Sequence, residues 1–259
     1  GNVAHLIIEK VFDGRPIKEA CDYYKTEYET IFEESVNEKG LLLRLPEYAI
    51  DLRRLKSKMQ EALDKLAETI INNGLTVDAC EYEFKQAKWT DAGNSVSLGS
   101  RADMLLSDAE GGKVIFDFKY SRSKSRKTEV EENRALQLEV YRYMAKQEFG
   151  KDTKVRVAYV LLPDVTILTA DEFDDIDAIK LKADRACADV IAEAARAYRF
   201  RWEQLKAGKI ERVEGCVPGT GEYASQIDEQ LLFPLTTHKQ DNKEVYSTDK
   251  FDKGYKNLK

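Results

Sequence analysis

Residues 114–121 read Val-Ile-Phe-Asp-Phe-Lys-Tyr-Ser, an apolar run that carries two charged side chains two positions apart. In a β-strand, residues i and i+2 project from the same face. Asp117 and Lys119 are therefore expected side by side on one face of a strand. Burying a carboxylate and an ammonium group is costly unless they are paired. We expect the pair to serve a site where a metal ion and a phosphate meet.

A second acid lies in the preceding strand-like run, in Gly99-Ser-Arg-Ala-Asp103. Acids on neighbouring strands can face each other across about 5 Å. Like charges at that distance repel, so Asp103 and Asp117 both stay ionised only if a cation lies between them. Two carboxylates, water and a phosphate oxygen are ligands that suit Mg²⁺. Taken alone, an Asp-x-Lys tripeptide is also explained by an ion pair on a surface strand.

The composition is that of a globular protein with an acidic surface. Of 259 residues, 42% are hydrophobic and 34% charged, and the formal net charge is −6. This size allows one or two domains. No apolar run approaches the roughly 18 residues of a membrane helix, so we expect no membrane association. Nucleic-acid binding would need a local basic patch, with a metal ion offsetting the remaining repulsion.

The four cysteines are scattered, and no Cys-x-x-Cys occurs. Zinc and iron–sulfur sites are therefore not expected. Dispersed thiols fit a reducing cytoplasm, where we expect the protein to be found. We expect the thiols to be buried or inert. The cysteines are Cys21, Cys80, Cys187 and Cys216.

Hydrophobic periodicity predicts helices first, then strands, then helices and strands in alternation. Steps of three and four predict helices over residues 2–13, 16–36 and 47–73. Three strands in a meander are predicted over 77–85, 95–107 and 113–120. A helix over 130–148, a strand over 154–162 that residues 165–168 extend beyond a kink, and a helix over 171–207 follow.

This order predicts an α/β fold with a central mixed β-sheet flanked by helices, with added N-terminal and C-terminal helices. We expect one domain over residues 1–259. It comprises a helical part (1–75), a sheet core with the site residues (76–170), and a C-terminal helix and tail (171–259). Because the chain begins inside a helical pattern, we expect it to be a fragment of a larger protein.

Three polar side chains on predicted helices complete the set. Gln137 and Tyr141 are four residues apart and share one helix face. His5 lies among apolar residues of the first predicted helix. Taken one at a time, these are also explained by a solvated helix face and a structural histidine.

In order along the chain, these residues resemble the RecB-like branch of the PD-(D/E)XK nucleases, over about residues 1–145. That branch includes the nuclease domains of RecB and AddB helicase–nucleases and some CRISPR-associated exonucleases. The resemblance implies a restriction-endonuclease-like core. The matching series is His5, Glu81 or Glu83, Gly99-x-x-x-Asp103, Asp117-x-Lys119 and Gln137-x-x-x-Tyr141.

The resemblance also implies a role for each residue. His5, Asp103, Asp117 and the carbonyl of Phe118 would hold Mg²⁺ or Mn²⁺, and Lys119 would be the catalytic lysine. The catalytic residues implied are Asp103, Asp117, Lys119, Gln137, Tyr141 and Glu81.

Two features of this series leave questions. Glu81 is preferred as the first-strand acid because Phe84 follows at the usual offset, but Glu83 remains an alternative. The spacing from Gly99 to Asp103 is one residue longer than the commonest form. The downstream cysteine group of the AddB-type iron–sulfur cluster is missing, so no cluster is expected.

The segment after residue 118 is strongly basic, with five basic residues among nine and no acid. We expect a loop whose Arg122, Lys124, Arg126 and Lys127 contact DNA phosphates. A solvated loop without a ligand is the alternative. Tyr120 is a candidate for stacking on bases of a single strand, although packing explains such aromatics equally well.

Together these expectations describe metal-assisted phosphodiester hydrolysis, in which Lys119 orients the attacking water. The function expected is a Mg²⁺-dependent deoxyribonuclease, an exonuclease in a RecB- or AddB-like DNA repair or recombination protein. Its partners would be DNA with single-stranded ends and a helicase segment or subunit. The alternative is a non-catalytic DNA-binding or scaffolding module with a relic site.

Overall fold

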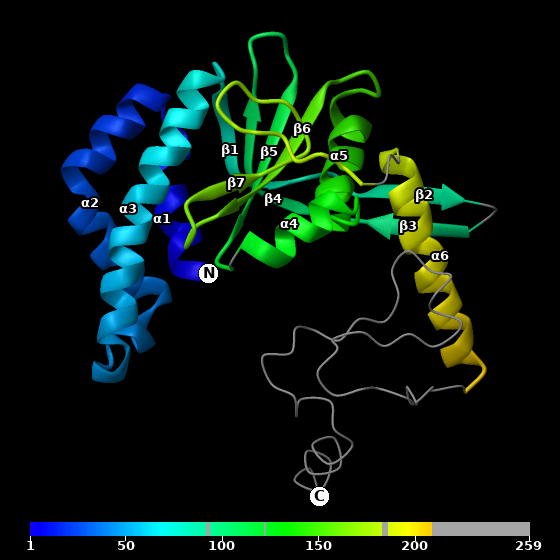
Figure 1. Ribbon diagram of the computed structural model, residues 1–259, viewed down its shortest axis with the longest axis horizontal. Helices are drawn as coiled ribbons and strands as arrows, with labels where there is room; N and C mark the ends of the chain where they lie inside the picture. The colour runs from blue at the N-terminus through cyan, green and yellow to red at the C-terminus, as the bar shows by residue number, and fades with distance from the viewer. Residues whose placement is uncertain (92–93, 122, 183–185, 209–259) are drawn as a thin grey trace, which may run out of the picture. The chain divides into compact units, whose positions relative to one another are not determined.

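The computed structural model describes residues 1–91, 94–121, 123–182 and 186–208 (Figure 1). The chain divides into two compact units, Gly1–Ala188 and Asp189–Lys259. Every predicted site residue lies in the first unit. Of the second unit, the structure describes residues 189–208, most of which belong to α6 (Cys187–Lys206). Arg122, Cys216 and the polar tail lie outside the described residues.

A five-stranded mixed sheet forms the centre of the first unit, in the order β1-β4-β5-β6-β7. β1, β4 and β5 form an antiparallel meander, β6 runs parallel to β5, and β7 is antiparallel to β6. The mixed sheet and the meander are as predicted. The strands are β1 (Thr76–Glu83), β4 (Arg101–Ser107), β5 (Lys113–Lys119), β6 (Val155–Leu161) and β7 (Thr166–Leu168).

The stretch that decides the fold is the central strand β5. Its residues from Val114 to Phe118 are all buried, since helices cover both faces of the sheet. A strand covered on both sides needs an almost continuous apolar sequence, and Val-Ile-Phe supplies it. Asp117 is the one charged side chain inside this buried run.

Three helices cover one face of the sheet (Figure 1). Their apolar residues at helical spacing, such as Ile7 and Leu63, are fully buried in one cluster with Phe116 of β5. This packing fixes the first helix, which carries His5, against the sheet. The helices are α1 (Asn2–Phe12), α2 (Ile17–Lys39) and α3 (Ala49–Asn72), with two short 3₁₀ turns, η1 (Leu41–Arg44) and η2 (Pro46–Tyr48), between the last two.

The opposite face carries a second apolar cluster, built mainly on α5 (Leu136–Phe149). Leu138 and Tyr141 of α5 are buried there with Ile115 of β5 and Tyr159 of β6. Together with α4 (Ser123–Glu131), α5 forms the crossover that a parallel step from β5 to β6 requires. Asp117 and the face of α5 that bears Tyr141 thus meet on this side of the sheet.

The prediction of a single strand over 95–107 is wrong. The run is broken at Gly99 and Ser100 into β3 (Asn94–Leu98) and β4. β3 pairs with β2 (Ala87–Asp91) as a separate two-stranded hairpin. Asp91 pairs with Asn94, so the two strands pair locally instead of extending the central sheet.

The predicted basic loop and two predicted helices also differ from the structure. Residues 123–131 form α4, and residues 132–135 separate it from α5. α4 was missed because, with Val130 as its buried apolar residue, it shows no apolar period. The predicted helix over 171–207 begins only at Cys187, since Ile179 N–H instead donates to Thr169 O (2.7 Å).

Residues 165–168 do not extend the preceding strand beyond a kink. The chain turns back at residues 162–165, and residues 166–168 form β7, which pairs antiparallel with β6. In the part of the chain that the structure describes, no helix combines the length and the apolar character needed to cross a membrane.

Candidate active site

The candidate site lies where β4 and β5 separate. Main-chain pairing of the two strands ends at Met104 and Phe116. One residue further along, Asp103 Oδ2 accepts a hydrogen bond from Phe118 N–H (2.6 Å). The carboxylate thus occupies the place of a main-chain acceptor, while β5 stays paired with β6 as far as Lys119. In this gap between β4 and β5, side chains that come from the two faces of the sheet lie close to one another.

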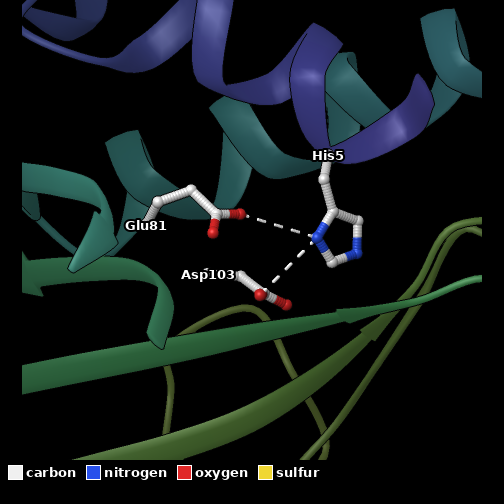
Figure 2. Close-up of side chains that lie close together, drawn as sticks. All are labelled: His5, Glu81 and Asp103. Atoms are coloured by element: carbon white, nitrogen blue, oxygen red, sulfur yellow. Dashed lines mark ion pairs between the residues drawn. The ribbon is translucent and has the colours of Figure 1, made fainter. Parts of the chain in front are cut away.

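Three potential metal ligands converge at this opening (Figure 2). His5 of α1 points toward the sheet, and Glu81 of β1 and Asp103 of β4 point toward its ring. His5 Nδ1 lies 3.8 Å from Glu81 Oε1 and 3.5 Å from Asp103 Oδ1. Among the described residues, this is the one group of three or more His, Cys, Asp or Glu whose ligand atoms all lie within 4.8 Å.

The His5 nitrogen and the carboxylate oxygens of this group favour a cation between them. His5 Nε2 lies 3.1 Å from Phe118 O, which can only accept, so Nε2 carries a proton. In the neutral ring, Nδ1 then presents a lone pair to two carboxylates. Such an arrangement is repulsive unless a proton or a metal ion lies among the three atoms.

Glu81 reaches this group through an irregular backbone. The β1–β4 register, which pairs Cys80 with Met104 and Tyr82 with Ala102, places Glu81 opposite Asp103. Like charges directly opposite on neighbouring strands are destabilising. Glu81 also has a φ of 52°, a left-handed conformation unusual for a residue with a side chain.

Asp117 is held from the other face of the sheet. Its side chain is 1% exposed, and Oδ1 accepts hydrogen bonds from Gln137 Nε2 (2.8 Å) and Tyr141 Oη (2.9 Å). Gln137 Nε2 also donates to Tyr141 Oη (2.9 Å). Burial and the adjacent Asp117 charge raise the pKa of Tyr141, so its hydroxyl stays protonated and can donate.

Asp117 and Lys119 form the pair that the alternation of β5 predicts. Lys119 Nζ lies 2.6 Å from Asp117 Oδ2. Oδ2 is buried and accepts no hydrogen bond from the described residues, so the ammonium is the cation that offsets its charge.

The site also contains residues that the sequence analysis missed. Tyr159 is the partner of Asp117 in the parallel register and is 1% exposed. Lys119 Nζ and Arg126 Cζ lie 5.9 and 5.3 Å from the centre of its ring. Arg101 Nε lies 2.9 Å from Glu81 Oε2. A tyrosine in a valine-rich strand beside β5 was the available signal for Tyr159.

The predicted DNA-binding residues on α4 differ in their surroundings. Lys124 and Lys127 are exposed. Arg126 is half-buried and pairs with Glu129 (2.7 Å) beside Tyr159. Glu83, the alternative to Glu81, is exposed and is not part of the His5 group.

A family model described as the PD-(D/E)XK nuclease superfamily matches residues 1–218. The chain belongs to the PD-(D/E)XK nuclease superfamily. The predicted restriction-endonuclease-like fold class is thereby confirmed. No curated protein matches the chain. Twelve chains of solved structures match. One of them is the crystal structure of SSO0001, which is 16% identical to this chain. The match covers 78% of this chain and 79% of that one, with a TM-score of 0.28.

Membership of this superfamily indicates hydrolysis of nucleic acids, and PD-(D/E)XK nucleases typically use divalent metal ions. The residues present fit such an ion. One imidazole nitrogen and two carboxylates converge, and the buried Asp117 Oδ2 accepts no hydrogen bond among the described residues. Carboxylates and an imidazole suit Mn²⁺, and the carboxylate oxygens suit Mg²⁺.

The pKa of the Asp103 carboxyl is also consistent with a cation at this site. Burial and, next, the charge of Asp117 raise the pKa of the Asp103 carboxyl from 3.8 to about 6, against the lowering effects of His5, Phe118 N–H and Lys119. The ionised carboxylate is therefore unfavourable in the folded chain, chiefly because it is buried. A divalent ion beside it would offset that cost.

Proposed function

We propose that this chain is a metal-dependent deoxyribonuclease, an exonuclease of the RecB- or AddB-like branch that acts in DNA repair or recombination. Residues 1–259 would form one nuclease domain of a larger protein, working on single-stranded DNA ends with a helicase segment or subunit. The observation that carries the proposal is the convergence of His5, Glu81 and Asp103 beside the Asp117–Lys119 pair, where β4 and β5 separate.

When bound, Mg²⁺ or Mn²⁺ would polarise the scissile phosphate and lower the pKa of a water molecule. His5, Asp103, Asp117 and the Phe118 carbonyl would hold the ion, and Glu81 would contribute to the same group. Lys119 would orient the attacking water and offset the charge that develops on the phosphate. In this role its ammonium is held by the buried carboxylate of Asp117.

The residues around Asp117 would keep this arrangement rigid. Gln137 and Tyr141 both donate to Asp117 Oδ1, which fixes the carboxylate and thereby the ammonium of Lys119. The exposed Lys124 and Lys127 of α4 would contact phosphates of the bound strand. Such contacts position DNA without reading its sequence.

The test is degradation of labelled single- and double-stranded DNA with Mg²⁺ or Mn²⁺. We expect cleavage by the wild-type protein and its loss in Lys119→Ala and Asp117→Ala. Lys113→Ala is the matched control, because Lys113 lies at the other end of β5 and also pairs with an acid, Asp78 (2.8 Å). Control activity should equal that of the wild type.

The outcomes separate the two candidate functions. Cleavage that survives in Lys119→Ala and Asp117→Ala would show that the assigned site does not do the chemistry. Binding of metal and DNA without cleavage would instead favour the scaffolding module. Circular single-stranded DNA distinguishes the mode of action, since an exonuclease leaves it intact and an endonuclease opens it.

A further inference from the structure

The turn region between α2 and α3 exposes an unusual number of large apolar side chains. Leu41 is 67% exposed and Leu42 is 73% exposed. Soluble proteins seldom expose contiguous apolar surface without a ligand for it. The exposed apolar side chains of residues 41–50 are Leu41, Leu42, Leu45, Tyr48 and Ile50.

Part of this surface lines an open groove of about 830 Å³. Its lining comes from the segment 40–43 with Tyr48, from the first residues of α1 and from Tyr120. The two tyrosine rings are 42% and 43% exposed. A groove of this size, with apolar walls and two partly exposed rings, suits flat aromatic groups.

The groove adjoins the candidate active site through the chain itself. Ala4 lines the groove, and the next residue is His5. Tyr120 lines it as well, directly after Lys119 at the end of β5. In Figure 1 the N-terminus accordingly lies near the end of β5. A strand with one phosphate at the site would have its neighbouring nucleotides at this groove.

We propose that this groove binds unpaired bases of a single DNA strand whose phosphate lies in the candidate active site. The inference rests on the proposed function and adds to it a recognition surface for bases. Stacking on aromatic rings is tolerant of sequence, because every base has a π-face.

Charges of both signs line the groove: Glu38 and Asp51 are acidic and Lys39 is basic. What favours bases inside it is therefore its apolar lining and its two partly exposed tyrosine rings. Burial is the largest cause of the raised pKa of Tyr120, so its hydroxyl stays protonated and the ring carries no charge that would repel DNA.

Base-dependent binding is measured with fluorescent single-stranded oligonucleotides in a Lys119→Ala background with Mg²⁺, so that cleavage does not interfere. Each oligonucleotide is compared with a version that has abasic sites next to the phosphate in the active site. We expect the abasic version to bind about five- to 150-fold more weakly for each stacked base lost. Its charge is unchanged, so phosphate contacts remain.

Two substitutions of residues that line the groove test the location. Tyr120→Ala and Leu42→Ser should each weaken binding of the intact oligonucleotide and leave the abasic one unaffected. Ile71→Ser is the matched control, since Ile71 is an exposed apolar residue near the other end of α3. It should change neither affinity.

Other results would overturn the inference. Equal binding of intact and abasic DNA would exclude base recognition, and equal weakening of both by Leu42→Ser would exclude the groove as its place. Dimers by sedimentation that Leu42→Ser dissociates, with DNA binding unaffected, would make this surface an interface between copies of the chain. Base-dependent binding by a wild-type protein that never cleaves would sustain the groove and reject the nuclease proposal.

Discussion

Asp103→Asn should make the metal-free protein more stable at neutral pH while abolishing cleavage. In the folded chain this carboxylate is buried near Asp117 and lies opposite Glu81. Asparagine removes the negative charge, and its side-chain oxygen can still accept the hydrogen bond from Phe118 N–H. The substitution therefore relieves repulsion without opening the packing.

The magnitude follows from the pKa of Asp103. The pKa rises from 3.8 to about 6 on folding, a difference of about 2. Each pKa unit is 1.36 kcal/mol, so ionised Asp103 lowers the free energy of unfolding by about 3 kcal/mol relative to the protonated form. Because the folded pKa is the higher one, the stability that Asp103 contributes is fully present below pH 3.8 and is lost as the pH rises through about 6. Allowing about 1 kcal/mol for a weaker hydrogen bond, we expect a gain of about 2 kcal/mol at pH 7.5.

Urea denaturation in EDTA, at pH 7.5 and at pH 4, measures this effect. The variant should be more stable at pH 7.5, and the difference should shrink toward zero at pH 4, where Asp103 is protonated in the folded state. Asp152→Asn, at an exposed position, is the control and should stay within about 0.5 kcal/mol of the wild type at both pH values. Adding Mn²⁺ at pH 7.5 should stabilise the wild type far more than the variant. A variant less stable than the wild type at pH 7.5, or a difference independent of pH, would refute the electrostatic reasoning.

Three further outcomes are expected. Tyr141→Phe removes a hydrogen-bond donor to the buried carboxylate of Asp117. Urea denaturation should therefore show a free energy of unfolding lower by about 1–3 kcal/mol, and kcat should fall. Unchanged values would mean that the hydroxyl does not support Asp117. Gly40→Ala places a Cβ 2.6 Å from Val3 Cγ2, so calorimetry should show a lower Tm, with a loss of about 1–3 kcal/mol, and an unchanged Tm would contradict this packing. The Kd for Mn²⁺, measured by calorimetry, should rise about tenfold for each pH unit below about 6, because the ion must displace the proton of Asp103; an affinity independent of pH would exclude Asp103 as a ligand.

The predictions that rested on short-range periodicity agree best with the structure. Alternation in a strand placed Asp117 and Lys119 side by side, and the ion pair at 2.6 Å confirms that geometry. Helical spacing placed Gln137 and Tyr141 on one face, and their hydrogen bonds to Asp117 confirm that as well. Both inferences depend only on the regular geometry of one element.

Features that depend on how strands and helices pair with one another were harder to predict from the sequence. The choice between Glu81 and Glu83 rests on the β1–β4 register and on a left-handed backbone at Glu81, neither of which leaves a local pattern. Tyr159 joins the site only because β6 runs parallel to β5 with Tyr159 beside Asp117. α4 lacked an apolar period, so its basic side chains suggested a loop.

Several unfavourable features coincide at the point where β4 and β5 separate. Glu81 and Asp103 oppose each other, Glu81 adopts a strained conformation, and the Asp103 carboxyl has a raised pKa. A network serving stability alone would gain nothing from these features, because apolar residues of similar size would remove all three. A cation placed among the acids and His5 would relieve the repulsion between the carboxylates. Helices on both faces hold these groups in position, so the fold keeps the acids and His5 together although their arrangement lowers stability.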